Sequence, residues 1–221
     1  MPFTSTKTSS RRIFLGGAFG CWAAGAFGGS AMAAPKRPVV TILGDSITAG
    51  YGLERADALP AQLQAALQRL GVAAEVRGAG VSGDTTAGGL ARVDFSVQPD
   101  TALCVVALGG NDLLQGLDPR VTRTNLDRII RRLQARKIKV LLCGLRAPRR
   151  LNAGYERDFD AAFPAAAKAA GVTLYPNLLA GVEQNPGLNQ RDGLHPNPKG
   201  VKIITSRLAP VIAHALRAAR A

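Results

Sequence analysis

The stretch "VVTILGDS", residues 39–46, is the clearest indication of the fold in this sequence. Its first five residues are apolar or β-branched, a composition typical of a strand buried in a parallel sheet. A glycine, an aspartate and a serine follow at once. Four more such runs lie further along the chain. The predicted strands therefore cover residues 39–43, 75–80, 102–108, 139–145 and 172–176.

Helix-like patterns lie between or after these runs. One places Leu63, Leu67 and Leu70 on a single helical face. Another has Pro119 at its first position behind Asp118, an aspartate that can cap the helix. Strands that alternate with helices favour one α/β domain around a parallel sheet. The predicted helices cover residues 58–70, 118–137, 155–171 (which ends at Gly171 as C-cap) and 197–218.

The first 33 residues have the features of an export signal. Arg11 and Arg12 precede a moderately apolar, glycine-rich run, and Ala31-Met32-Ala33 is typical of a cleavage site. The arginine pair resembles a twin-arginine signal, which would engage the twin-arginine export machinery. We therefore expect residues 1–33 to be removed and residues 34–221 to form the mature domain, periplasmic or secreted. The glycines disfavour a retained membrane anchor, so no stable membrane insertion is expected after signal removal.

The chain is strongly basic, with a formal net charge of +13. The predicted signal carries three basic residues and no acids, so the remainder still has a charge of +10. Many of the arginines lie in "DRIIRRLQARKIK", residues 127–139, whose apolar residues have helical spacing, so the arginines are expected on a solvated helix face. No nucleic-acid motif or aromatic platform accompanies them, so no nucleic-acid partner is predicted.

Two cysteines, Cys104 and Cys143, remain after signal removal, each in a strand-like run. Cys104 comes early in its run and Cys143 comes late. If the strands are parallel neighbours, this stagger exceeds the roughly 7 Å that a disulfide can span between Cα atoms. We expect two free, buried thiols.

Polar and glycine-rich residues follow the predicted strands. Ser46 follows the first strand, Gly83 the second and Asn111 the third, while Asp192 and His195 lie in a loop after the fifth. The carboxyl ends of parallel strands meet at one edge of a sheet, and ligands bind there. The sequence therefore predicts a site at this edge.

These residue types are those of acyl transfer. A serine becomes a nucleophile when a base takes its proton, and His195 can act as this base for Ser46. Asp192, three residues before His195, can hold the other imidazole nitrogen. The Ser46 and Gly83 N–H groups and the Asn111 side chain are candidate donors to an oxyanion.

Taken singly, each residue also has a structural interpretation. Ser46 could cap a helix, Gly83 could make a turn, and Asn111 or Asp112 could cap the next helix. Two histidines and no zinc-binding motif make a metal site unexpected. The G-x-S-x-G motif of ordinary α/β-hydrolases is also missing around Ser46.

Four segments together resemble the sequence blocks of the SGNH (GDSL) hydrolases, in the right order. They are "LGDSITAGYGL" (43–53), "GVSGDTTAGGLAR" (80–92), "LGGNDLLQGL" (108–117) and "DGLHPN" (192–197). The resemblance is greatest to the bacterial periplasmic acyl-CoA thioesterase I, arylesterase and lysophospholipase branch. The first block has GDSI rather than GDSL.

The resemblance implies a flavodoxin-like three-layer α/β/α fold, a Ser46-Asp192-His195 triad and an oxyanion hole of Ser46, Gly83 and Asn111. It implies no cofactor, and small acyl esters or thioesters as substrates of a monomer. The segment "LRAPRRLNAG" (145–154) corresponds to the family's substrate loop, so Leu145, Ala147 and Pro148 are candidate substrate contacts. Its arginines, Arg146, Arg149 and Arg150, would favour anionic substrates near the mouth of an acyl groove.

Two other functions remain open from the sequence. One is a carbohydrate O-deacetylase on the same fold, which would act on acetylated sugars and hardly on longer acyl esters. The other is a non-catalytic lipid- or glycan-binding module. A binding module has no need of a complete triad and oxyanion hole, so the sequence favours the esterase and thioesterase activity.

Overall fold

The computed structural model describes residues 37–149 and 151–218. The predicted signal peptide lies outside the described residues. Five parallel strands form one sheet in the order β2-β1-β3-β4-β5. The strands are β1 (Val39–Gly44), β2 (Glu75–Gly80), β3 (Thr101–Ala107), β4 (Lys139–Cys143) and β5 (Thr173–Tyr175). The prediction of a five-stranded parallel sheet is confirmed, with strand ends that differ by one or two residues.

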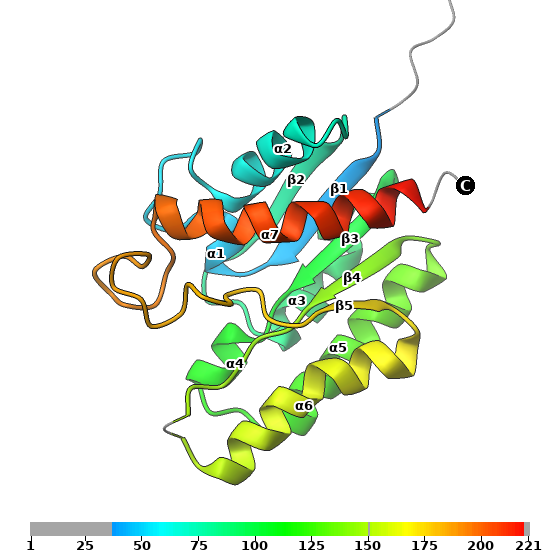
Figure 1. The fold of residues 1–221 in the computed structure, drawn as a ribbon. Helices are drawn as coiled ribbons and strands as arrows, with labels where there is room; N and C mark the ends of the chain where they lie inside the picture. The colour runs from blue at the N-terminus through cyan, green and yellow to red at the C-terminus, as the bar shows by residue number, and fades with distance from the viewer. Residues whose placement is uncertain (1–36, 150, 219–221) are drawn as a thin grey trace, which may run out of the picture. The chain divides into compact units, whose positions relative to one another are not determined.

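Helices cover both faces of the sheet (Figure 1). Helices α2 and α7 pack against each other on one face, and α3, α5 and α6 form the other layer. The α/β/α arrangement is confirmed. The helices are α1 (Ser46–Ala49), α2 (Leu59–Arg69), α3 (Thr86–Ser96), α4 (Gly110–Leu114), α5 (Pro119–Ala135), α6 (Ala153–Ala170) and α7 (Pro198–Arg217). None of the helices in the described residues is both long and apolar enough to cross a membrane.

The capping residues explain why the longer helices begin and end where they do. The side chain of Asp118 accepts a hydrogen bond from the N–H of Arg120 at the start of α5, as predicted. Gly171 ends α6 in the left-handed conformation, with φ 63°. Asn197 caps α7 by accepting from the N–H groups of its first turn. The Asn197 cap fixes the start of α7, the helix that follows the loop of Asp192 and His195.

Helices α1, α3 and α4 were not among the predicted elements. Two glycines, Gly88 and Gly89, weaken the helical pattern of α3. A Cβ atom on Gly89 would lie 2.2 Å from a methyl carbon of Leu108, so a larger residue there would displace this buried side chain. The idea that Asp112 caps the next helix is wrong. Gly109 is the N-cap of α4, and Asp112 bonds the first residue of α3 instead.

Cys104 and Cys143 are both buried and free in the structure. Cys104 pairs in register with Val140, three residues before Cys143 on the same strand. This is the stagger that the sequence pattern indicates. Burial raises the pKa of each thiol to about 12, so both stay protonated.

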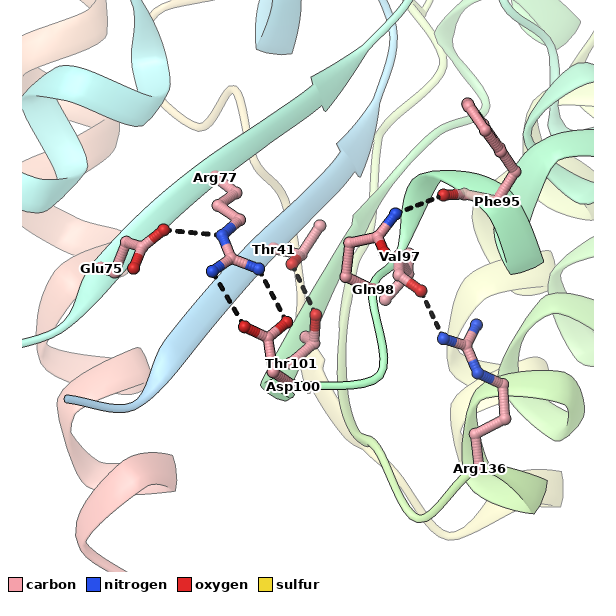
Figure 2. A network of polar contacts seen from close by, with 9 residues as sticks. All are labelled: Thr41, Glu75, Arg77, Phe95, Val97, Gln98, Asp100, Thr101 and Arg136. Atoms are coloured by element: carbon pink, nitrogen blue, oxygen red, sulfur yellow. Dashed lines mark hydrogen bonds and ion pairs between the residues drawn. The ribbon is translucent and has the colours of Figure 1, made fainter. Parts of the chain in front are cut away.

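Ion pairs and hydrogen bonds tie the amino ends of the strands together (Figure 2). The guanidinium of Arg77 on β2 donates to both carboxylate oxygens of Asp100, which precedes β3, at 2.7 and 2.9 Å. The hydroxyls of Thr41 and Thr101 share a buried hydrogen bond of 2.8 Å between β1 and β3. Arg136, just after α5, donates to the carbonyl of Val97. At this end of the sheet, polar and charged side chains therefore bond to one another and to the backbone, and they hold neighbouring elements together.

Candidate active site

Ser46 lies where β1 ends and α1 begins, at the carboxyl edge of the sheet. Asp45 caps α1 by accepting the N–H of Ile47 at 3.0 Å, so Ser46 is the first helical residue and not the cap. The N–H groups of a first turn have no partner within their own helix. A Cβ atom on Gly80, at the end of β2, would lie 2.3 Å from the backbone nitrogen of Ala49. Glycine at this position therefore lets α1 lie directly on the strand ends.

The structure brings Ser46, His195 and Asp192 together in one hydrogen-bonded chain. The Nε2 atom of His195 is 2.9 Å from the Oγ atom of Ser46. The Nδ1 atom of His195 is 2.6 Å from the Oδ2 atom of Asp192. A serine, an imidazole and a carboxylate in this order have the geometry of a nucleophile, a general base and the group that orients the base.

Asp192 also organises its own loop. Its Oδ1 atom accepts the backbone N–H groups of Leu194 and His195, at 2.9 and 3.0 Å. These two N–H groups and the His195 imidazole lower the pKa of Asp192 to about 2. The carboxylate is therefore ionised at any working pH, which suits a group that holds an imidazolium.

The rest of the loop is fixed by amide side chains. Gln190 donates from Nε2 to the carbonyls of Tyr51 and Pro196, at 2.8 and 3.1 Å, and so joins this loop to the residues after α1. Asn189, which is buried, donates to the carbonyl of Val182. The ring of Tyr51 lies against the His195 ring, with centroids 4.6 Å apart.

The two other predicted oxyanion donors lie on a loop and on a short helix. Gly83 has φ +84°, a conformation that favours glycine, and no hydrogen bond within the described residues uses its N–H. Asn111, the second residue of α4, donates from Nδ2 to the backbone carbonyl of Asp84 at 2.8 Å. An amide has two N–H groups, so Asn111 keeps one for a ligand.

Asp112 connects this edge to the layer of α3 and α5. It is fully buried, and its carboxylate accepts from the backbone N–H and the hydroxyl of Thr86, at 2.8 and 2.5 Å. Thr122 on α5 adds a third hydrogen bond at 3.2 Å. The carboxylate is thus satisfied by neutral donors, and it fixes α4, which carries Asn111, against the start of α3.

A cavity of about 270 Å³ opens beside Ser46, and Gly83, Asn111 and His195 line it together with Ser46. Asp192 stands behind His195 and is not part of the lining. Most of the cavity surface is apolar. The leucines that line it are Leu113, Leu114, Leu145, Leu178, Leu179 and Leu194.

The predicted substrate loop contributes only in part. Leu145 lines the cavity, whereas Ala147 and Pro148 do not. The N–H of Ala147 donates to Asp160 on α6 at 2.9 Å, which draws this part of the segment toward the helix. Arg146 lines the cavity but forms an ion pair of 3.1 Å with the same Asp160. Arg149 is exposed and not part of the lining, and Arg150 lies outside the described residues.

Asp45 and Tyr51 are two site residues that the sequence interpretation did not assign. Asp45 lines the cavity, is 6% exposed and lies next to the serine. Burial raises its pKa to about 6, against the opposing effects of the Ile47 N–H and of His195. Tyr51 contacts His195 across a large sequence separation. Both lie within the block that contains Ser46, which is the only sequence signal that could have found them.

Comparisons with known proteins agree with this geometry. Residues 42–203 match the model of the GDSL-like lipase/acylhydrolase family. The chain is 35% identical over 176 residues to Esterase TesA of Pseudomonas aeruginosa, covering 77% of this chain and 88% of that protein. It is 35% identical over 178 residues to Thioesterase 1/protease 1/lysophospholipase L1 of Escherichia coli, covering 78% and 84%.

A solved structure has the same fold. The crystal structure of AlinE4, an SGNH-hydrolase family esterase, is 44% identical and superposes with a TM-score of 0.69. The superposition covers 83% of this chain and 99% of AlinE4. The family match spans well over half of the sequence. The chain therefore belongs to the GDSL-like lipase/acylhydrolase family, and it is an ester hydrolase.

Proposed function

We propose that the protein is a serine esterase and thioesterase that works through an acyl-enzyme on Ser46. The observation that carries the proposal is the pair of short contacts from the two nitrogens of His195, 2.9 Å to Ser46 and 2.6 Å to Asp192. A structural histidine has no need to bridge a cavity-facing serine and a carboxylate. The family supports the same chemistry.

In the first half-reaction, Oγ of Ser46 attacks the carbonyl carbon while its proton passes to Nε2 of His195. Asp192 holds the Nδ1–H of the imidazolium that forms. The carbonyl oxygen becomes an oxyanion, with the Ser46 and Gly83 N–H groups and the Asn111 amide as its donors. The bond to the alcohol or thiol then breaks, and the leaving group takes the proton from His195.

In the second half-reaction, water replaces the leaving group. His195 takes a proton from the water, whose oxygen attacks the acyl carbon, and the proton then returns to Oγ as Ser46 is released. The products are a carboxylic acid and the free enzyme. No cofactor takes part in the proposed reaction.

The cavity beside Ser46 argues for an acyl chain as the bound group. Its leucine lining buries methylene groups, each worth about 0.8 kcal/mol when removed from water. An acetylated sugar would leave this lining unfilled. We therefore place acyl esters and thioesters with chains longer than acetyl above the carbohydrate O-deacetylase and the binding module.

The test is hydrolysis of p-nitrophenyl esters from acetyl to palmitoyl by the mature protein and by Ser46→Ala. We expect activity that rises from acetyl to longer chains and that falls by about 10⁴-fold or more in the variant. Activity on acetyl alone would favour the deacetylase. A folded protein without activity on any of these esters would contradict the proposal.

We further propose that a twin-arginine signal in residues 1–33 exports the enzyme to the periplasm or the medium, where it acts as a monomer. Arg11 and Arg12 support the export route, since the twin-arginine machinery reads this pair. Replacing both by lysine should leave the precursor in the cytoplasm. Continued export of this variant would favour the general secretory route. Size-exclusion chromatography with light scattering would test the monomer.

A further inference from the structure

Arg92, on α3, joins three segments that surround the proposed oxyanion site. Its Nε donates to the Oδ2 atom of Asp84 at 2.5 Å. Its Nη2 donates to the carbonyl of Gly44 at 2.7 Å, and its Nη1 to the carbonyl of Ala79 at 2.9 Å. Gly44 ends β1 two residues before Ser46, and Ala79 is the last residue but one of β2. One guanidinium thus connects the segment of the nucleophile to the segment of Gly83.

The loop of Gly83 has little else to hold it. A Cβ atom built on Gly83 would meet nothing within 4 Å, so packing does not fix this residue. A hydrogen bond of 3.1 Å from the N–H of Asp84 to the carbonyl of Val81 closes the turn, and the loop is otherwise held at its two ends. Val81 donates its N–H to the carbonyl of Gly44 at 3.1 Å, and the carboxylate of Asp84 is bound by Arg92. Arg92 also donates to the Gly44 carbonyl that accepts the Val81 N–H. Gly44, Arg92, Asp84 and the loop from Val81 to Asp84 therefore form a closed ring of contacts that contains Gly83.

The ring also includes the third proposed donor. The backbone carbonyl of Asp84 accepts the Nδ2–H of Asn111, so the position of Asp84 sets the direction in which Asn111 points its amide. The ion pair is shielded from solvent, because the side chains of Arg92 and Asp84 are 18% and 16% exposed. Shielded charge-assisted hydrogen bonds are stronger than those of exposed pairs and hold geometry more tightly.

We propose that Arg92 is a positioning residue, which holds Gly83 and Asn111 at a fixed distance from Ser46. The proposal rests on the serine mechanism proposed above. Arg92 touches no reacting atom and does not line the cavity. Its effect is on the oxyanion, which forms only in the transition state, so its loss lowers kcat and leaves substrate binding in place.

The test compares Arg92→Met and Arg92→Lys with Arg77→Met, a matched control that breaks an arginine–aspartate pair at the opposite end of the sheet. A p-nitrophenyl alkylphosphonate counts the reactive sites, since each phosphonylated serine releases one p-nitrophenolate. We expect kcat per reactive site to fall by about 100-fold in Arg92→Met, somewhat less than the total loss of one oxyanion donor, with KM nearly unchanged. Arg77→Met should keep the wild-type kcat.

Two inhibitors separate positioning from a loss of folding. An alkylboronic acid becomes tetrahedral on the serine and places an oxygen in the oxyanion site, so its inhibition constant should rise with the fall in kcat. A fatty alcohol fills only the acyl cavity, so its constant should not change. Arg92→Lys should recover part of the rate, because lysine keeps a cation but lacks the fork that reaches three acceptors.

An unchanged kcat per reactive site in both Arg92→Met and Arg92→Lys would overturn the inference. A variant with a lower kcat but an unchanged inhibition constant for the alkylboronic acid would overturn it too. If Arg92→Met does not fold, Arg92→Lys and Asp84→Asn decide the question by the same readouts. Failure of the serine mechanism itself would show differently, as ester hydrolysis retained in Ser46→Ala.

Discussion

The two ends of the sheet differ in how their charged groups are matched. At the amino end, Arg77 donates to both oxygens of Asp100 and also to Glu75, so a positive side chain is paired with two negative ones (Figure 2). At the carboxyl end, Asp84 pairs with Arg92, whereas Asp45, Asp112 and Asp192 accept from backbone N–H groups, hydroxyls or an imidazole. The proposed nucleophile, Ser46, and two of the proposed oxyanion donors, Gly83 and Asn111, line a cavity there.

This difference indicates what each end contributes. A paired group at the amino end has its interactions completed within the fold, so its substitution should affect stability. A proposed oxyanion donor at the carboxyl end keeps hydrogen-bonding capacity for a ligand, so its substitution should affect turnover. Arg92 belongs to both classes in our proposal, because its guanidinium is bound by three acceptors within the fold and its substitution is expected to affect turnover.

The largest effect is expected from Asp192→Asn. The substitution removes the carboxylate that orients the His195 imidazole and favours its protonated form, so kcat should fall by about 10⁴-fold. The Oδ1 atom of an asparagine can still accept the loop N–H groups, so the unfolding midpoint should move little. Steady-state kinetics and thermal unfolding check this. A rate within a factor of about ten of the wild type would show that Asp192 is not part of the machinery.

Asn111→Ala should follow, with a loss in kcat of about 10²- to 10³-fold, because one oxyanion donor is removed. Asn111 also bonds the carbonyl of Asp84, so a small loss of stability is expected as well. The KM for a p-nitrophenyl ester should stay near the wild-type value. A rise in KM with an unchanged kcat would move Asn111 from the oxyanion site to substrate binding.

Asp45→Asn tests the matching of charge at the carboxyl end through pH. The pKa of Asp45 rises from 3.8 in a free chain to about 6 in the fold, chiefly because of burial. The folded state therefore holds the proton more tightly than the unfolded state. Stability should fall as pH rises from about 4 to about 6, by about 3 kcal/mol from this group, and stay level above that.

The asparagine variant keeps the cap on α1 and cannot ionise. We expect its free energy of unfolding to equal the wild type's near pH 4 and to exceed it at pH 8. Urea unfolding at several pH values measures the difference between the two proteins, which removes the contribution of other groups. A constant difference across this pH range would show that Asp45 is not perturbed in the fold.

The smallest effect is expected from Arg77→Met at the amino end. The side chains of Arg77 and Asp100 are 34% and 36% exposed, so solvent screens the pair and its loss should cost about 1 kcal/mol. Turnover should not change, because the network ends far from the cavity. Urea unfolding and ester kinetics check both statements. A fall in kcat here would remove the distinction between the two ends.

The sequence predicts the central strands β1, β3 and β4 well because each is largely a run of buried apolar residues. The outer strands β2 and β5 have no buried residue, and their prediction rests on the alternation of strands and helices along the chain. Helix α5 is predicted well, since its apolar spacing and the Asp118-Pro119 start are local signals. Helix α3 is missed because Gly88 and Gly89 oppose a helix locally. Gly89 lies directly against the Leu108 side chain, a contact that only the folded chain contains.

The residues of the candidate site also fall into those that the sequence predicts and those that only the folded structure identifies. Ser46, Asp192 and His195 are predictable because their residue types match a known chemistry and their blocks resemble a known family. Tyr51 and Arg92 lie in two of the same blocks, but their residue types indicate no step of that chemistry. Tyr51 matters through its contact with His195, and Arg92 through three acceptors on separate segments, and neither arrangement is visible before the strands are paired.

The most direct test of the proposed serine mechanism is the site at which a fluorophosphonate labels the active enzyme. This reagent forms a covalent bond to an activated serine with loss of fluoride, and mass spectrometry of peptides locates the bond. The mechanism predicts one adduct, on Ser46, formed in step with the loss of esterase activity and absent from His195→Ala. An adduct on Ser82, which lines the same cavity, or full activity without an adduct on Ser46, would contradict it.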